Sequence, residues 1–160
     1  RYTARLSFAC FVLVYLAAPL YQISQAAPLL WLRQNRRNAG ISFGLLHSIH
    51  LGALISFFVM TPEHTNLPTI IIGGGAYGAM FAMLATSNDA AIRYIGTKNW
   101  RILHKFGIHY LAVVFALTYL SSLAESPDMH KPYWLIALAW LIILLRMAQY
   151  IATLLKGQKP

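Results

Sequence analysis

Acidic side chains are scarce in this sequence. Its 160 residues include only four Asp and Glu against 13 Lys and Arg, and 11% of all residues are charged. Soluble domains usually carry about 25% charged residues. Hydrophobic residues make up 58% of the chain, more apolar surface than a soluble domain of this size can bury. We therefore expect a polytopic membrane protein. Its net charge of +9 then reflects basic cytoplasmic loops rather than a nucleic-acid partner.

Several kinds of site are disfavoured by what is missing. The single cysteine, Cys10, cannot form an internal disulfide, and we interpret it as a packed or lipid-facing thiol. The carboxylates are too few and too peripheral for a di-iron centre or a proton path. No charged or broken-helix site lies in the middle of an apolar stretch, which disfavours a small transporter.

Five apolar segments approach the roughly 20 residues that a helix needs to cross a bilayer. They cover residues 6–23, 40–60, 67–86, 100–120 and 133–155, and Arg146 interrupts the last. The predicted fold class is all-α, a membrane helical bundle of about five helices that forms a single domain over residues 1–160. Gly74 and Gly78 form a Gly-x-x-x-Gly pattern, from which we expect close helix packing.

The distribution of basic residues predicts the orientation. We call the side reached after the first span side B and the opposite side side A. Side B holds ten basic residues: Arg33, Arg36, Arg37, Arg93, Lys98, Arg101, Lys105, Arg146, Lys156 and Lys159. Side A holds three: Arg1, Arg5 and Lys131. This excess predicts that side B is cytoplasmic, in a bacterial inner membrane. The N-terminus then lies outside, and we expect that a further span originally preceded Arg1.

Four histidines lie within the second and fourth apolar segments: His47, His50, His104 and His109. An ionisable side chain inside a membrane marks a functional site by default. Neutral imidazole is a common axial ligand of haem iron. We therefore predict haem b, ligated by two of these four histidines, one from each helix. The alternatives are histidines that only bond neighbouring helices, and a zinc site, for which the sequence lacks close-spaced ligands.

The depth of each histidine can be estimated from the basic residue at the start of its span. His47 lies ten residues beyond Arg37, and His109 lies eight beyond Arg101. At about 1.5 Å per residue their depths differ by about 3 Å, which makes them the best-matched pair. His104 lies nearer the cytoplasmic surface.

Basic residues gather where the spans meet side B. Arg36, Arg37, Arg101, Lys105 and Arg146 could pair with anionic haem propionates. The simpler interpretation is the excess of basic residues that cytoplasmic loops generally carry.

Two passages resemble the ferric-reductase-like transmembrane domain family. One is Arg-Arg-Asn-Ala-Gly at residues 36–40, followed by an apolar run to His50. The other is Thr-Ser-Asn at residues 86–88, followed by Ile-Gly-Thr-Lys-Asn-Trp-Arg-Ile-Leu-His at residues 95–104. The resemblance covers about residues 31–119. The family includes NADPH oxidases, ferric reductases and the haem-binding membrane subunit of the bacterial methionine sulfoxide reductase system.

The resemblance implies which histidines bind haem. His50 matches the family's ligand on the first haem helix, and His104 matches the first ligand on the second. The family usually has another histidine 13 or 14 residues later, where this sequence has Leu117 and Thr118. In this respect the chain departs from the family pattern, and the resemblance and the depth estimate favour different histidines.

The expected function is electron transfer. Haem iron with two histidine ligands has no open position for substrate, so oxygen activation is not expected. Only residues 156–160 follow the last span, and we expect no flavin or nicotinamide domain on this chain. Electrons would come from a quinone or a partner protein. The chain would be a membrane b-type cytochrome subunit of an oxidoreductase. The alternative is a haem-free accessory subunit of a larger membrane complex.

Overall fold

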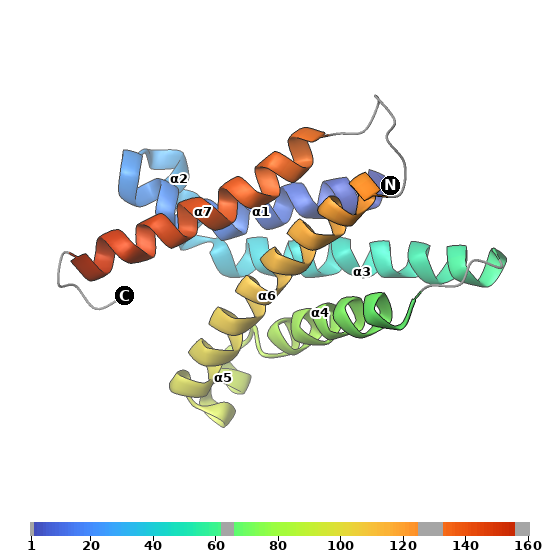
Figure 1. Ribbon diagram of the computed structural model, residues 1–160. Coiled ribbons are helices and arrows are strands. Elements are labelled where there is room, and N and C mark those ends of the chain that lie inside the picture. Colours follow the sequence, from blue (N-terminus) through green and yellow to red (C-terminus); the bar gives the residue numbers. More distant parts are fainter. Residues whose placement is uncertain (1, 62–65, 125–132, 156–160) are drawn as a thin grey trace.

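The protein is a bundle of helices (Figure 1). The computed structural model describes residues 2–61, 66–124 and 133–155, and all regular structure within these ranges is helical. In the described part of the chain, five helices are long and apolar enough to cross a membrane. They are α1 (Tyr2–Ser24), α3 (Arg36–Met60), α4 (Leu67–Ala85), α6 (Thr97–Ala124) and α7 (Tyr133–Leu155). The predicted fold class is confirmed, and the chain is a multi-pass membrane protein.

Two short helices were not expected from the sequence: α2 (Ala27–Gln34) and α5 (Asp89–Ile95). The start of α5 is stabilised because the Asn88 side chain accepts a hydrogen bond from the Ala91 backbone N–H at 2.8 Å. The helix ends at Gly96, whose φ of 80° is a conformation that glycine adopts readily. Helix α5 lies in a polar connection, whereas α2 is largely apolar but, at eight residues, too short to cross a membrane.

Helix α1 is the central element of the bundle. It packs against α2, α3 and α7, while α6 packs against α4 and α7. In the most apolar 18-residue stretch of α1, 39% of the residues are buried, compared with 11–28% in the other four long helices. Figure 1 shows α1, α3 and α7 lying roughly along one another, with α6 crossing them obliquely. Side chains on α1 can therefore reach both α3 and α6.

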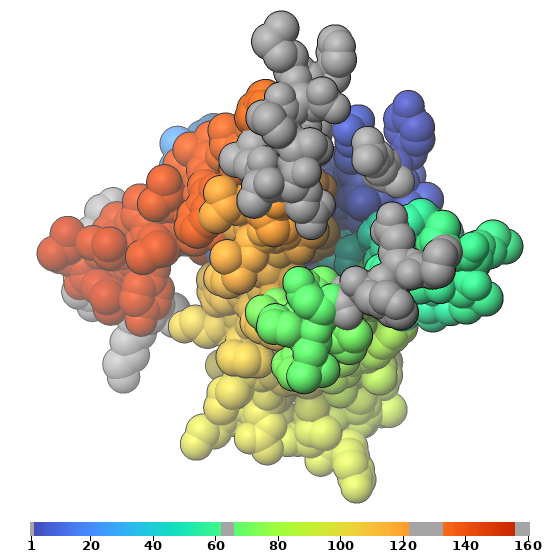
Figure 2. Space-filling model, turned by 45° about the vertical axis from the view of Figure 1, so that its right-hand side comes forward, coloured from blue at the N-terminus to red at the C-terminus, as the bar shows by residue number. Residues whose placement is uncertain are grey.

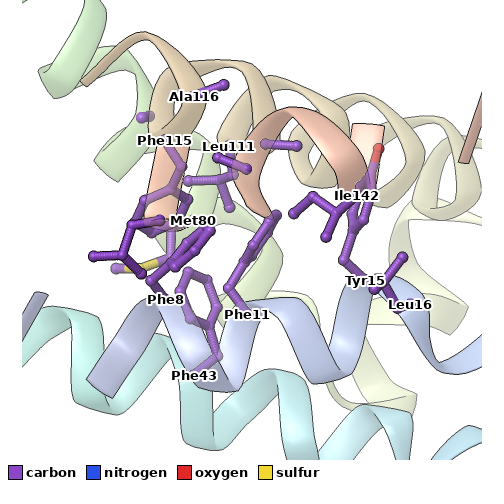
Figure 3. Close-up of a cluster of buried hydrophobic side chains, with 14 residues drawn as sticks. Phe8, Phe11, Tyr15, Leu16, Phe43, Met80, Leu111, Phe115, Ala116 and Ile142 are labelled. Atoms are coloured by element: carbon purple, nitrogen blue, oxygen red, sulfur yellow. The ribbon is translucent and has the colours of Figure 1, made fainter. Parts of the chain in front are cut away.

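A cluster of aromatic and aliphatic side chains holds these helices together (Figure 3). Phe8 and Phe11 of α1 both pack on Phe115 of α6, with ring centroids 5.1 Å apart in each pair. Phe11 also contacts Phe43 of α3 at 5.3 Å. Such offset and tilted ring contacts add to the stabilisation from burial alone.

The outer surface of the bundle is apolar, as lipid contact requires. Figure 2 shows α4, α6 and α7 together on one face of the bundle. Large hydrophobic side chains point outward along the long helices, among them Ile49, Val59 and Ile71, which are 62%, 80% and 63% exposed. An apolar surface of this extent is stable against hydrocarbon and not against water.

The prediction of close helix packing at Gly74 and Gly78 is wrong. A Cβ atom added at either position would meet nothing within 4 Å. The close approach occurs instead at Gly75, where an added Cβ would lie 2.7 Å from the Tyr110 hydroxyl oxygen. The Gly-x-x-x-Gly spacing identified the right segment. The face of α4 that packs on α6, however, contains Gly75, the residue after Gly74.

Candidate functional site

The four predicted histidines all lie on the two helices where the sequence placed them. His47 and His50 are on α3, and His104 and His109 are on α6. His47 is the most enclosed, with only 8% of its surface exposed. The other two histidines of the chain, His64 and His130, lie outside the described residues.

Three of the four histidines contact hydroxyl groups on α1. The Nδ1 atom of His47 lies 3.0 Å from Ser7 Oγ, and the Nδ1 atom of His50 lies 3.0 Å from Thr3 Oγ1. The Nδ1 atom of His109 lies 2.9 Å from the Tyr15 hydroxyl oxygen. Each of these hydrogen bonds involves Nδ1, so the Nε2 atom of each ring is not bonded to α1.

His104 is held differently, at the side B end of the bundle. Its Nε2 atom lies 3.1 Å from Thr86 Oγ1, at the end of α4. Its ring packs on Trp100 with centroids 4.3 Å apart, and the Trp100 indole N–H donates to the Thr86 carbonyl oxygen at 3.0 Å. This arrangement joins the start of α6 to the end of α4.

The contacts with α1 place the histidines at different depths. His50 and His47 lie level with Thr3 and Ser7, whereas His109 lies level with Tyr15. Ser7 and Tyr15 are eight residues apart, which is about 12 Å along a helix. The depth match predicted for His47 and His109, about 3 Å, is therefore wrong.

The estimate failed because α3 and α6 do not start at the same depth. Arg37, at the start of α3, donates to the Ser87 carbonyl oxygen and to Asp89, at 2.7 and 2.8 Å. The start of α3 is thus level with the connection between α4 and α5. Helix α6 begins only after α5, and the residue of α6 that contacts the end of α4 is His104, whose Nε2 lies 3.1 Å from Thr86 Oγ1. Every residue of α6 is consequently displaced toward side B relative to α3.

Aromatic side chains enclose His47. Its ring centroid lies 4.8 Å from that of Tyr77 on α4, 5.4 Å from that of Phe43 and 5.3 Å from that of Phe115 on α6. His50 is its neighbour on α3, at 5.4 Å between ring centroids. At the depth of His47, α6 therefore presents a phenylalanine ring rather than an imidazole.

His109 has more open surroundings. It lines a groove along α6 together with Ile102, Lys105, Phe106, Tyr110 and Val113. The guanidinium group of Arg146 on α7 lies 5.6 Å from the centre of the Tyr15 ring, and Tyr15 bonds His109. Among the described residues the only carboxylate is that of Asp89, which pairs with Arg37 at 2.8 Å. The cation of Arg146 has no carboxylate partner there.

Sequence reasoning missed the hydroxyl partners on α1. Thr3 and Ser7 are four residues apart, while His47 and His50 are three apart, so each pair lies on one face of its helix. Helices α1 and α3 follow one another with only the short α2 between them, and their antiparallel packing brings the two pairs together. The matched spacing of hydroxyls and imidazoles on consecutive spans could have predicted these hydrogen bonds.

The sequence has a curated relative of stated function. It is 29% identical, over 122 residues, to the protein-methionine-sulfoxide reductase heme-binding subunit MsrQ of Azospira oryzae. The match covers 71% of this chain and 52% of that protein, so the chain spans about half the length of the relative. No protein-family profile matches the sequence, and no solved structure matches it. The chain is a distant relative of a haem-binding subunit.

The donor chemistry of the described histidines suits haem, although His47 of α3 meets the Phe115 ring of α6 and not an imidazole. Imidazoles held at Nδ1 and surrounded by aromatic rings have the form that haem ligands take in proteins. Within the described ranges, no three His, Cys, Asp or Glu side chains come together as metal ligands. These side chains therefore favour haem, which needs one or two protein ligands, over a zinc site with three or four.

Proposed function

We propose that this protein is a membrane b-type cytochrome subunit that transfers electrons to or from a partner through histidine-ligated haem. One observation carries the proposal. His47 is an ionisable side chain inside the apolar bundle, its Nδ1 is hydrogen-bonded to Ser7, and three aromatic rings pack around it. The distant relationship to a haem-binding subunit supports it.

Each part of the site has a role in this function. When bound, the haem iron supplies a reversible one-electron step. Two of His47, His50, His104 and His109 would hold the iron, one from α3 and one from α6. Phe43, Tyr77 and Phe115 exclude water around His47, which favours the less charged form of a nearby redox group. Arg146, with no carboxylate partner in the described chain, supplies a cation for a propionate.

The rest of the proposal concerns the protein's surroundings. Residues 1–160 form one domain in a bacterial inner membrane, with side B in the cytoplasm. Lipid covers the outer faces of the long helices. A quinone or a partner protein exchanges electrons with the haem, within a larger membrane complex.

A second candidate is a haem-free accessory subunit of such a complex. The packing of Phe115 against His47 favours it, because this ring fills the place of an α6 ligand to the same iron. The absence of the family's further histidine at Leu117 or Thr118 agrees with this alternative.

Measuring haem in the purified protein distinguishes the two candidates. We expect near-stoichiometric haem with a b-type spectrum after reduction by dithionite. Replacing each of His47, His50, His104 and His109 singly by Ala should weaken haem binding at least about tenfold in two or more cases, with one from each helix. His64→Ala, in a polar connection, is the matched control. Haem-free protein, or four variants with wild-type spectra, would overturn the electron-transfer function.

A further inference from the structure

The groove along α6 faces the surrounding membrane rather than the interior of the bundle. It has a volume of about 480 Å³, and its lining is almost entirely apolar. Ile102, Phe106 and Val113 run along its middle, and all three side chains are exposed. These positions recur at helical spacing, so they form one stripe along the helix. An apolar stripe of this kind suits a hydrocarbon chain.

The two helices that pack against α6 meet the groove at its edges. At one edge, the Tyr110 hydroxyl donates to the Ile72 carbonyl oxygen of α4 at 3.0 Å. At the other edge, the ammonium group of Lys105 lies 5.3 Å from the centre of the Tyr150 ring of α7. The edges are therefore fixed by α4 and α7, while the stripe between them remains open.

The length of the groove matches one leaflet of a bilayer. From Ile102 to Val113 the chain advances eleven residues, which is about 16 Å along a helix. The hydrocarbon core of a bilayer is about 30 Å thick, so each leaflet contributes about 15 Å. The groove begins near Thr97, the side B end of α6. One acyl chain of a lipid in the side B leaflet can thus lie along its whole length.

Lys105 supplies a positive charge at the end of the groove nearer side B. Helical side chains lean toward the N-terminus of their helix, which for α6 is side B. The ammonium group of Lys105 therefore extends toward the lipid headgroups while its carbon chain lines the groove. In the described ranges the one carboxylate, that of Asp89, pairs with Arg37. The cation of Lys105 is consequently left for an anion from outside the protein.

We propose that this groove binds one molecule of an anionic phospholipid from the side B leaflet. The phosphate lies at Lys105, and one acyl chain lies along Ile102, Phe106 and Val113. Basic sites between membrane helices on the cytoplasmic side are typical binding sites for anionic headgroups. Lipid that merely surrounds the protein would cover every apolar face alike, whereas this site combines a cation with a groove of leaflet length. The inference does not depend on haem.

Native mass spectrometry of the purified protein tests the role of the cation. The probes are dioleoylphosphatidylglycerol and dioleoylphosphatidylcholine, which have the same chains and differ in net charge. The wild-type protein should retain one molecule of the anionic lipid in preference to the neutral one. Lys105→Ala should weaken binding of the anionic lipid about fivefold, and Lys105→Arg should preserve it. Lys98→Ala is the matched control, because Lys98 is an exposed cation of the same helix outside the groove.

A second pair of variants tests the acyl chain. Val113→Trp fills the groove and should abolish retention of the anionic lipid. Leu144→Trp on α7 should not, because Leu144, 59% exposed against 45% for Val113, does not line the groove. Glycerol phosphate, which has no acyl chain, should not compete with the lipid. Equal retention of both lipids, equal effects of Lys105→Ala and Lys98→Ala, or competition by glycerol phosphate would overturn the inference. Loss of haem from Val113→Trp with lipid retention unchanged would also overturn it, by assigning the groove to haem.

Discussion

At the scale of single residues, Gly75 is one of the positions where α4 and α6 approach closely. The Tyr110 hydroxyl donates to the Ile72 carbonyl oxygen at 3.0 Å, next to the position where Gly75 lacks a side chain. A Cβ at Gly75 would lie 2.7 Å from the Tyr110 oxygen. The same change at Gly74 meets nothing within 4 Å. Two adjacent glycines of one helix thus have different roles.

We predict that Gly75→Ala is less stable than Gly74→Ala by about 1 kcal/mol, because the added methyl group displaces the Tyr110 hydroxyl from its acceptor. Both variants gain the same helix propensity, which cancels in the comparison. Thermal unfolding in detergent micelles measures the difference. In a Tyr110→Phe background, where the hydroxyl is absent, the difference between the two variants should largely disappear. An undiminished difference would show that another contact limits the approach of the helices.

At the scale of helices, the sequence predicted the elements better than their relative depth. The five apolar segments correspond to α1, α3, α4, α6 and α7, since hydropathy over about 20 residues depends on composition alone. The pairing of His47 with His109 failed because depth depends on where a helix starts and how it tilts. The polar connection before α6 contains α5, whose seven residues displace that start. The partners of the histidines came from α1, a helix without histidine.

We predict that Phe115→His raises haem retention and that Leu117→His does not. Phe115 faces His47, with its ring centroid 5.3 Å away, whereas Leu117 is 42% exposed on the outer surface of α6. A histidine at position 115 would complete a ligand pair with His47, which should strengthen haem binding by about tenfold or more. Haem titration of the two purified variants measures this. The reverse result would mean that α6 binds haem with the face indicated by the family pattern, and not with the face that packs on His47.

At the scale of the whole molecule, charge and geometry agree on which ends of the helices share a side. The end of α4 and the starts of α3 and α6 are tied together by contacts of Arg37 with Ser87 and of His104 with Thr86. Seven of the ten basic residues assigned to side B lie at these ends or in the connections beside them: Arg33, Arg36, Arg37, Arg93, Lys98, Arg101 and Lys105. The packing shows which helix ends lie together, and the distribution of Lys and Arg shows which side is basic. These two lines of evidence are independent of each other. Only the direction in the membrane rests on charge alone.

That direction can be tested with the one native cysteine removed. In a Cys10→Ala background, Met60→Cys places a thiol at the side A end of α3, and Tyr94→Cys places one on α5 at side B; the replaced side chains are 82% and 91% exposed. A membrane-impermeant maleimide applied to intact spheroplasts should label Met60→Cys at once and Tyr94→Cys only after permeabilisation, because loops rich in Lys and Arg remain in the cytoplasm. Cys10→Ala alone should stay unlabelled. Labelling of Tyr94→Cys in intact spheroplasts would reverse the orientation and would put His104, the histidine tied to α4 at Thr86, near the outer surface.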